Sequence, residues 1–232
     1  MSRVEQQRNI IDYTLSSLLR RPFKNSLLIL VYTLIIFSLG SVLLFTRAIR
    51  KEASILLREA PDMIVQRIVA GRHDLIPLSY LDTIASIEGT AAVRERLWGY
   101  YFDSAKGANY TLIVPATCGL RPGEVAIGVG VAAVRNVYKG EKLFFKAYNG
   151  EVISLRIRGI LAPGSELIAA DLIYICGDDF RKVFGVPEGY ATDLVLKAVN
   201  REDVKAIASK VSIALPDTRS ITQDEILGIY DT

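Results

Sequence analysis

One run of apolar residues constrains this chain more than any other feature of its sequence. Residues 25–46 read NSLLILVYTLIIFSLGSVLLFT and carry no charge between Lys24 and Arg47. As an α-helix the run is about 33 Å long, which matches the roughly 30 Å hydrocarbon core of a bilayer. A soluble protein would need a far larger body to bury a helix that is apolar on every face. We therefore expect a transmembrane helix.

The rest of the sequence offers no second segment of this kind. Residues 110–116 and 167–176 are the next most apolar stretches, but both are short and rich in β-forming residues. The residues that follow the run, from Arg47 to Lys51, contain no small-residue cleavage site, so we do not expect a removable signal peptide. The sequence predicts a single-pass protein that keeps its anchor.

Charge narrows the function classes and leaves the orientation open. The 232 residues include 28 Lys and Arg against 25 Asp and Glu, a formal net charge of +3. Such a small excess gives no electrostatic case for nucleic-acid binding. Basic residues flank both ends of the apolar run, so the positive-inside rule does not decide the orientation. Because a long following domain is translocated largely regardless of its charge, we expect a plasma (inner) membrane protein with a cytoplasmic N-terminus and a periplasmic or extracellular main domain.

The pattern of polarity divides the chain into five segments. We expect an amphipathic helix on the cytoplasmic membrane surface over residues 1–24, the transmembrane helix over 25–46, a helical stalk over 47–61, an extracytoplasmic core domain over 62–222 and a return toward the membrane over 223–232. The alternative for the first segment is an exposed helix that frays at the terminus.

The core domain mixes short strands and helices. Strands are expected over residues 63–69, 93–102, 109–114, 124–127, 142–148, 151–160, 172–175, 192–198 and 219–222, and helices over 79–89, 129–137, 178–184 and 201–213. Asn149-Gly150 predicts a hairpin, and the spacing of Ser79 and Asp82 predicts a capping box at a helix start. Mixed ββ and βα units favour an α+β domain of two small subdomains over a doubly wound parallel sheet.

One motif resembles a dinucleotide-binding fingerprint. Residues 128–133 read GVGVAA, which fits G-x-G-x-x-A between an expected strand and an expected helix, and Glu151 follows about 20 residues later. Such a site needs a parallel strand after the helix, whereas an antiparallel hairpin is expected over 142–160. We therefore interpret the motif as a tight turn from strand to helix.

Other signals of catalysis are weak. His73 is the only histidine, so a metal site or a catalytic triad would depend on this one imidazole, and we interpret it as a polar loop residue. Asp178 and Asp179 stand at an expected helix start, where an N-cap and a first-turn acid explain both. The sequence has no G-x-x-x-x-G-K-[ST] motif for ATP. We expect no catalytic residue, cofactor or metal in this chain, and an outer-face enzyme acting through His73 is the remaining catalytic alternative.

Two covalent modifications are compatible with an extracytoplasmic domain. Cys118 and Cys176 are the only cysteines, and either one disulfide or two unpaired buried thiols would explain them. Asn109-Tyr110-Thr111 is a glycosylation sequon, which has meaning only if the source organism glycosylates exported domains.

Several segments carry a family resemblance in their order along the chain. Residues 18–27 (LLRRPFKNSL), which lead into the apolar run, resemble the N-terminus of MacB/FtsX-type ABC-transporter permeases. The following part is similar to the periplasmic core domain of that family in residues 61–65 (PDMIV), 81–92 (LDTIASIEGTAA), 123–128 (GEVAIG), 154–161 (SLRIRGIL), 171–174 and 192–195. The resemblance thus covers nearly the whole chain.

The resemblance implies a function and its partners. It implies the permease subunit of an ABC transporter of the MacB/FtsX/Lol type, in which a separate cytoplasmic ATPase moves the outer domain to export or extract a lipid, lipoprotein, peptide or drug. It also implies a second permease chain, as a homodimer or heterodimer, and an outer partner protein. Such permeases continue with three more spans, which this sequence does not contain. The alternative is a single-pass scaffold or interaction subunit that uses the same domain for assembly without transport.

Overall fold

The computed structural model describes residues 7–8, 12–13, 20, 22–58, 61–117, 119–161 and 170–228. The chain divides into two compact units, residues 1–56 and residues 57–232. The amphipathic helix expected before residue 22 lies mostly outside the described residues. The end of the described chain forms a short helix, α8 (Gln223–Gly228), and the expected return of this segment toward the membrane stays a prediction.

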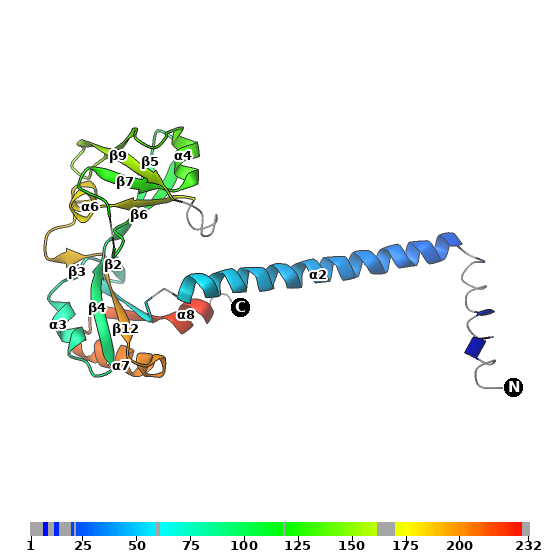
Figure 1. Cartoon of the computed structure of the whole chain (residues 1–232). Coiled ribbons are helices and arrows are strands. Elements are labelled where there is room, and N and C mark those ends of the chain that lie inside the picture. Colours follow the sequence, from blue (N-terminus) through cyan, green and yellow to red (C-terminus); the bar gives the residue numbers. More distant parts are fainter. Residues whose placement is uncertain are drawn as a thin grey trace. The chain divides into compact units, whose positions relative to one another are not determined.

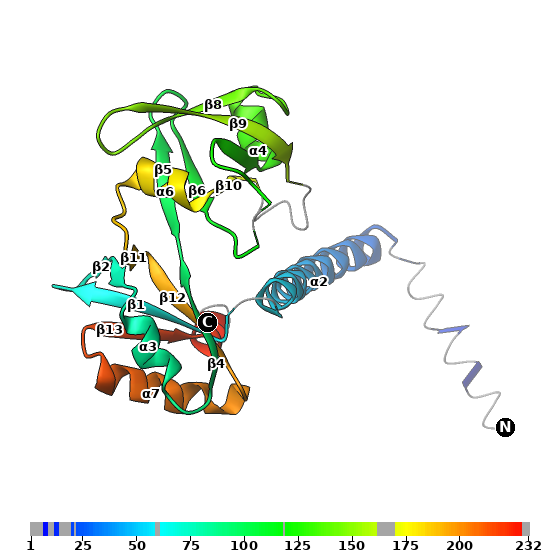
Figure 2. The ribbon, with the colours of Figure 1, turned by 60° about the vertical axis from the view of Figure 1, so that its left-hand side comes forward.

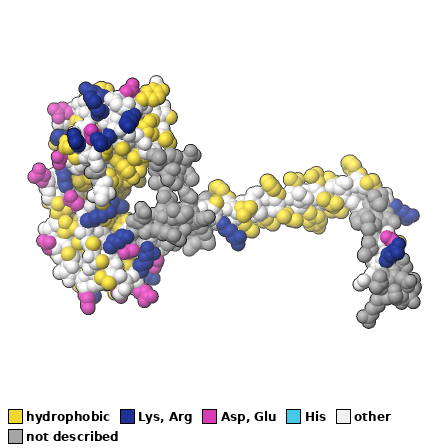
Figure 3. All heavy atoms as spheres, in the orientation of Figure 1, with side chains coloured by type: hydrophobic (Ala, Val, Ile, Leu, Met, Phe, Trp, Pro, Cys, Tyr) yellow, Lys and Arg dark blue, Asp and Glu magenta, His cyan; other side chains and the backbone are white. Residues whose placement is uncertain are grey.

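A single long helix makes up most of the first unit. Helix α2 runs without a break from Pro22 to Arg58 (Figure 1). Its first residue is a proline, which suits a position where the backbone N–H would have no partner in the helix. Residues 22–48 are long and apolar enough to cross a membrane, and their most apolar window has no buried side chain. Hydrophobic side chains cover the visible face of this helix (Figure 3). Apolar side chains exposed along a whole helix need an apolar medium around them. The expected segment boundaries at residues 24, 46 and 61 stay predictions.

The second unit contains two lobes, each built on its own sheet. We define lobe 1 as residues 61–96 and 190–228, and lobe 2 as residues 98–184. The lobe 1 sheet has the order β13-β1-β12-β4, with β2 paired to the end of β1, and all of its pairings are antiparallel. Its strands are β1 (Met63–Val69), β2 (Arg72–Asp74), β4 (Thr90–Arg96), β12 (Asp193–Ala198) and β13 (Thr218–Thr222).

Short helices complete the core of lobe 1. These are α3 (Tyr80–Ala85), the 3-10 helix η1 (Arg201–Asp203) and α7 (Val204–Ala214). A small antiparallel pair, β3 (Ile76–Pro77) with β11 (Tyr190–Ala191), lies beside the sheet. Apolar side chains of α3 and α7, such as Ile84 and Ile207, join the buried faces of β1 and β12 in the hydrophobic core. Burial of this apolar surface is the main stabilising contribution to the lobe.

Lobe 2 carries a mixed sheet with the order β5-β6-β10-β7-β9-β8. Its elements are β5 (Trp98–Asp103), β6 (Ala108–Ile113), β7 (Glu124–Ile127), α4 (Val129–Arg135), β8 (Lys142–Lys146), β9 (Val152–Ile160), β10 (Leu172–Ile175) and α6 (Gly177–Phe184). The two edge strands approach each other, because the rings of Tyr101 and Phe145 lie 5.2 Å apart and the Lys146 N–H donates to the Tyr101 hydroxyl at 2.7 Å. The sheet is therefore strongly curved, with β8 and β9 arching over the end of the lobe (Figure 2).

The expected α+β fold of two small subdomains behind an apolar helix is confirmed, but three local expectations are wrong. Residues 93–102 form two strands in different sheets instead of one, since Leu97 is buried between them and its carbonyl accepts the Val114 N–H at 2.9 Å. Ser79 forms no capping box, because its backbone is already helical and its side chain makes no cap hydrogen bond. The expected hairpin over 142–160 is present, with Gly150 at φ +89°. The third error is the expected absence of a parallel strand after the helix, because the second strand of the hairpin, β9, is also a parallel neighbour of β7. Strands β7 and β9 therefore do form a parallel pair, which is joined through α4 and β8.

Candidate functional site at the junction of the two lobes

The chain passes between the lobes at two places, and these crossings form the candidate site. The first crossing is Leu97, between β4 and β5, and the second is residues 185–189, between α6 and β11. Gly185 and Gly189 have φ of +70° and +83°, a region that favours glycine. A Cβ at Gly185 would also lie 2.7 Å from the ring of Tyr148. The backbone of the second crossing thus depends on glycine at its first residue.

A buried carboxylate ties the first crossing to lobe 1. Asp193 is fully buried at the start of β12, directly opposite Arg96 of β4. Its two oxygens accept hydrogen bonds from Arg96 Nε at 2.7 Å and Nη2 at 2.6 Å. The indole N–H of Trp98, the first residue of β5, donates to the same carboxylate at 2.8 Å. Paired donors of this kind bind a carboxylate with fixed geometry, so Asp193 holds the first strand of lobe 2 against lobe 1.

Thr192 adds further bonds between lobe 1 and the first crossing. Its hydroxyl donates to the Trp98 carbonyl at 2.9 Å and accepts the Trp98 N–H at 3.1 Å. Its own N–H donates to the Arg96 carbonyl at 3.1 Å. We call Arg96, Trp98, Thr192 and Asp193 the junction network. The network bonds Trp98 of lobe 2 to Thr192 and Asp193 of lobe 1, which restrains the angle between the lobes.

Arg181 of α6 adds a second set of contacts at the junction. Its Nη1 donates to the carbonyls of Pro187 at 2.7 Å and Tyr190 at 2.9 Å, and its Nη2 lies 3.7 Å from a Glu95 carboxylate oxygen. The guanidinium therefore spans from lobe 2 to the second crossing and to β4 of lobe 1. Such a fork of donors serves two carbonyls at once, which a lysine could not do with the same geometry.

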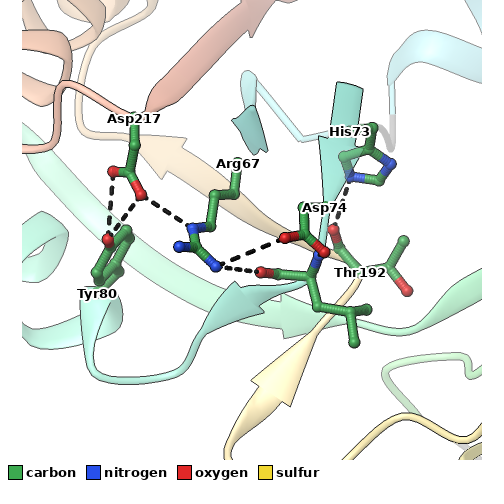
Figure 4. Close-up of polar contacts among 7 residues, drawn as sticks. Arg67, His73, Asp74, Tyr80, Thr192 and Asp217 are labelled. Atoms are coloured by element: carbon green, nitrogen blue, oxygen red, sulfur yellow. Dashed lines mark hydrogen bonds and ion pairs between the residues drawn. The ribbon is translucent and has the colours of Figure 1, made fainter. Parts of the chain in front are cut away.

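His73 lies beside the junction rather than in a loop. It is an exposed residue of β2, and its Nε2 donates to the Thr192 carbonyl at 2.9 Å (Figure 4). It borders an open cleft of about 290 Å³ that is lined by His73, Asp74, Leu75, Trp98, Phe180, Phe184, Val186 and Thr192. The lining residues include no serine or cysteine that His73 could activate as a nucleophile. The arrangement favours an anchoring role for this imidazole.

A polar cluster in lobe 1 fixes the strand that carries His73. Arg67 Nε donates to Asp217 at 2.9 Å, and the Tyr80 hydroxyl donates to the same carboxylate at 2.9 and 3.2 Å (Figure 4). Arg67 Nη1 also donates to the Leu75 carbonyl at 3.4 Å and lies 3.8 Å from Asp74. Burial pushes the pKa of Asp217 upward, but the hydrogen bonds from Arg67 and Tyr80 outweigh it, so this pKa is lowered. Burial and the bond to Asp217 raise the pKa of Tyr80.

The glycine motif at residues 128–133 forms the expected turn from strand β7 to helix α4. The Gly128 N–H donates to the Leu172 carbonyl at 2.7 Å and the Val131 N–H to the Ala170 carbonyl at 2.9 Å, so the chain itself uses these donors. A Cβ at Gly130 would lie 2.6 Å from the Ala170 oxygen. Gly130 therefore serves close backbone packing and not a phosphate group.

Asp178 and Asp179 both lie in the first turn of α6, so the expected first-turn acid is confirmed, but the expected N-cap is wrong. The N-cap of α6 is Cys176, so neither Asp178 nor Asp179 caps the helix. Asp178 is exposed, whereas Asp179 is buried and accepts the Gly123 N–H at 2.6 Å. The sequence does not predict this contact, because Gly123 lies 56 residues before Asp179.

The remaining candidate residues stay predictions. Cys176 is half-buried, but Cys118 lies outside the described residues, so their pairing is untested. Asn109 is an exposed residue of β6, and its glycosylation is also untested. In the part of the chain that the structure describes, no group of three or more His, Cys, Asp or Glu side chains could hold a metal ion.

The sequence reasoning missed the junction network itself. The available signals were the lone tryptophan and an aspartate that begins the apolar run Leu194–Leu196. A charge at the edge of a buried strand predicts a charged partner, but only the pairing of β4 with β12 identifies it as Arg96.

No family model and no curated protein sequence matches the chain. Its structure is similar to the crystal structure of the periplasmic region of MacB from Actinobacillus actinomycetemcomitans, with a TM-score of 0.50 and 12% identity, over 76% of this chain and 96% of that one. The chain has the MacB periplasmic fold. The MacB-like domain also resembles the extracellular domain of the noncanonic ABC-type transporter YknZ from Gram-positive bacteria, with a TM-score of 0.45 and 9% identity, over 69% of this chain and 99% of that one.

Proposed function

We propose that this chain is a permease-type subunit of an ABC transporter, anchored by α2 and carrying its MacB-like domain outside the cytoplasm. A separate cytoplasmic ATPase subunit supplies the energy, and the domain moves in response. The single observation that carries the proposal is the MacB periplasmic fold on a chain that also contains an apolar helix long enough to span a bilayer. A second permease chain completes the membrane assembly.

The start of the MacB-like domain is suited to receive a force. Asp62 is buried, and its Oδ2 accepts the Ala198 N–H at 3.0 Å. Its backbone N–H donates to the Leu196 carbonyl at 3.0 Å, and its carbonyl accepts the Gln223 N–H at 3.1 Å. The first residues of the domain are therefore bonded to β12 and to the start of α8 at the same time. A displacement that reaches Asp62 acts directly on the lobe 1 sheet.

The junction network extends this path to lobe 2. Strand β12, which is bonded to Asp62 at its C-terminal end, begins with Asp193 of the network. A movement of β12 is thus passed to Trp98 and β5 through hydrogen bonds of 2.6–3.1 Å. In this proposal the two lobes transmit movement to an outer substrate or partner, and ATP hydrolysis occurs in the other subunit.

Co-purification tests the proposal. The full chain is isolated from its own membrane in mild detergent, and every co-purifying chain is identified by mass spectrometry. We expect a stoichiometric ATP-binding subunit, and we expect protease added to intact spheroplasts to digest residues 61–228. An assembly of membrane proteins without an ATP-binding subunit would instead indicate a scaffold, and a protected domain would contradict the orientation.

A further inference from the structure

The outward face of the β8–β9 hairpin is basic and partly apolar. Side chains alternate along both strands, and the exposed set consists of Lys142, Phe144, Lys146, Val152, Ser154, Arg156, Arg158 and Ile160. Phe144 and Val152 are 54% and 68% exposed. Figure 3 shows Lys and Arg side chains beside hydrophobic ones over this lobe. We call Lys142, Phe144, Lys146, Val152 and Arg156 the hairpin face.

Three cations of this face have no acidic partner among the described residues. Lys142 lies directly opposite Arg156 in the β8–β9 register, an arrangement of like charges that destabilises a sheet. Glu124 is the β7 neighbour of Arg156, but its carboxylate binds Arg158 at 3.2 Å and the Arg121 N–H at 3.0 Å. The described ion pairs include none for Lys142, Lys146 or Arg156. The fold thus tolerates a concentrated positive charge around an exposed phenylalanine.

Protection of a sheet edge explains only part of this pattern. Lysines on an edge strand discourage pairing with other chains, and β8 is an edge strand. Arg156, however, lies on β9, which is paired on both sides by β7 and β8. Its positive charge therefore has no role in protecting an edge.

We infer that the hairpin face binds an acidic, extended segment of a partner protein. An extended segment presents every second side chain on one side, which matches the Lys142, Phe144, Lys146 spacing of β8. Acidic side chains of the partner would pair with the cations, and an apolar side chain would cover Phe144. An aromatic centre with a charged rim is typical of protein interfaces. Basic clusters that bind lipid usually lie next to a membrane-spanning helix or on an amphipathic helix, whereas this cluster lies on a β-hairpin, so a membrane is the less favoured occupant. This inference does not depend on the proposed ATPase coupling.

Binding of a designed peptide tests the inference. The full chain is held in nanodiscs of phosphatidylcholine, and the probe is a fluorescent peptide of three Glu-Thr-Phe-Thr repeats. We expect saturable binding that weakens as salt is added, and no binding of the matching Lys-Thr-Phe-Thr peptide. The triple variant Lys142→Glu, Lys146→Glu, Arg156→Glu is expected to weaken binding at least about tenfold.

A matched variant separates this surface from general charge effects. Arg72→Glu, Arg94→Glu, Lys197→Glu makes the same change of charge at exposed positions of lobe 1 and is expected to bind the peptide as the unmodified protein does. Both variants must keep the unmodified melting temperature. Absence of peptide binding, equal loss in both triple variants, or saturable binding of dihexanoyl phosphatidylglycerol in place of the peptide would overturn the inference.

Discussion

Asp193 is the residue on which the junction depends most. Substitution by Asn removes the negative charge that Arg96 and Trp98 share, and leaves Arg96 with an uncompensated charge. We expect the free energy of unfolding to fall by about 2–4 kcal/mol. This loss is near the low end of the range for breaking a buried ion pair, because the Arg96 side chain is one-quarter exposed and water can partly solvate its charge. Trp98 is the only tryptophan, so its fluorescence reports urea unfolding at the junction itself. The exposed Asp178→Asn is the control and should change stability by less than about 0.5 kcal/mol. Equal effects of the two substitutions would contradict the role given to Asp193.

Asp217 makes the stability of lobe 1 depend on pH in the acid range. Its pKa in the folded protein is below that in the unfolded chain, so its contribution is complete above the ordinary aspartate value of about 3.9 and is lost as the pH falls through the lower folded value. The stability difference between the unmodified protein and Asp217→Asn should therefore be constant above about pH 5 and shrink below about pH 4. Urea midpoints measured from pH 6 to pH 2 check this, and a difference that grows toward low pH would show the opposite sign.

Among the secondary-structure elements, helix α4 depends on the close packing of Gly130 against the backbone at Ala170. Gly130→Ala places a Cβ 2.6 Å from the Ala170 oxygen, so the turn must shift, at a cost of about 1–3 kcal/mol. Gly177→Ala, at the first residue of α6, meets nothing within 4 Å and should be neutral or slightly stabilising. Melting temperatures of the two variants provide the comparison. A tolerated alanine at position 130 would mean that another feature requires the glycine.

Local patterns explain which elements the sequence predicts correctly. Strand β1 matches its expected range because a run rich in β-forming residues ends at a turn with Ala70 and Gly71 at positive φ. The break at Leu97 has no turn residue to mark it, since the buried side chain and the carbonyl bond to Val114 arise only from tertiary packing. The parallel pairing of β7 with β9 is likewise a non-local choice, made across α4 and β8. The candidate site was missed for the same reason, because Arg96 and Asp193 meet only through strand register.

At the scale of the whole molecule, we propose that a membrane anchor is combined with a domain that transmits movement. In this proposal helix α2 provides the anchor, Asp62 receives the displacement, and the junction network carries it to lobe 2. Backbone amides at the junction should therefore change their exchange with solvent when the lobes move. The relevant segments are residues 97–98 and 185–193, where the chain crosses between lobes.

Hydrogen exchange of the complete complex, with its co-purified ATP-binding subunit in nanodiscs, tests this claim most directly. The exchange of residues 61–228 is compared with ATP and vanadate and without nucleotide. We predict a change in protection at residues 97–98 and 185–193, and a smaller change in Asp193→Asn, where the junction is weakened. Identical exchange throughout the domain in both states would contradict the coupling of ATP hydrolysis to movement of this domain.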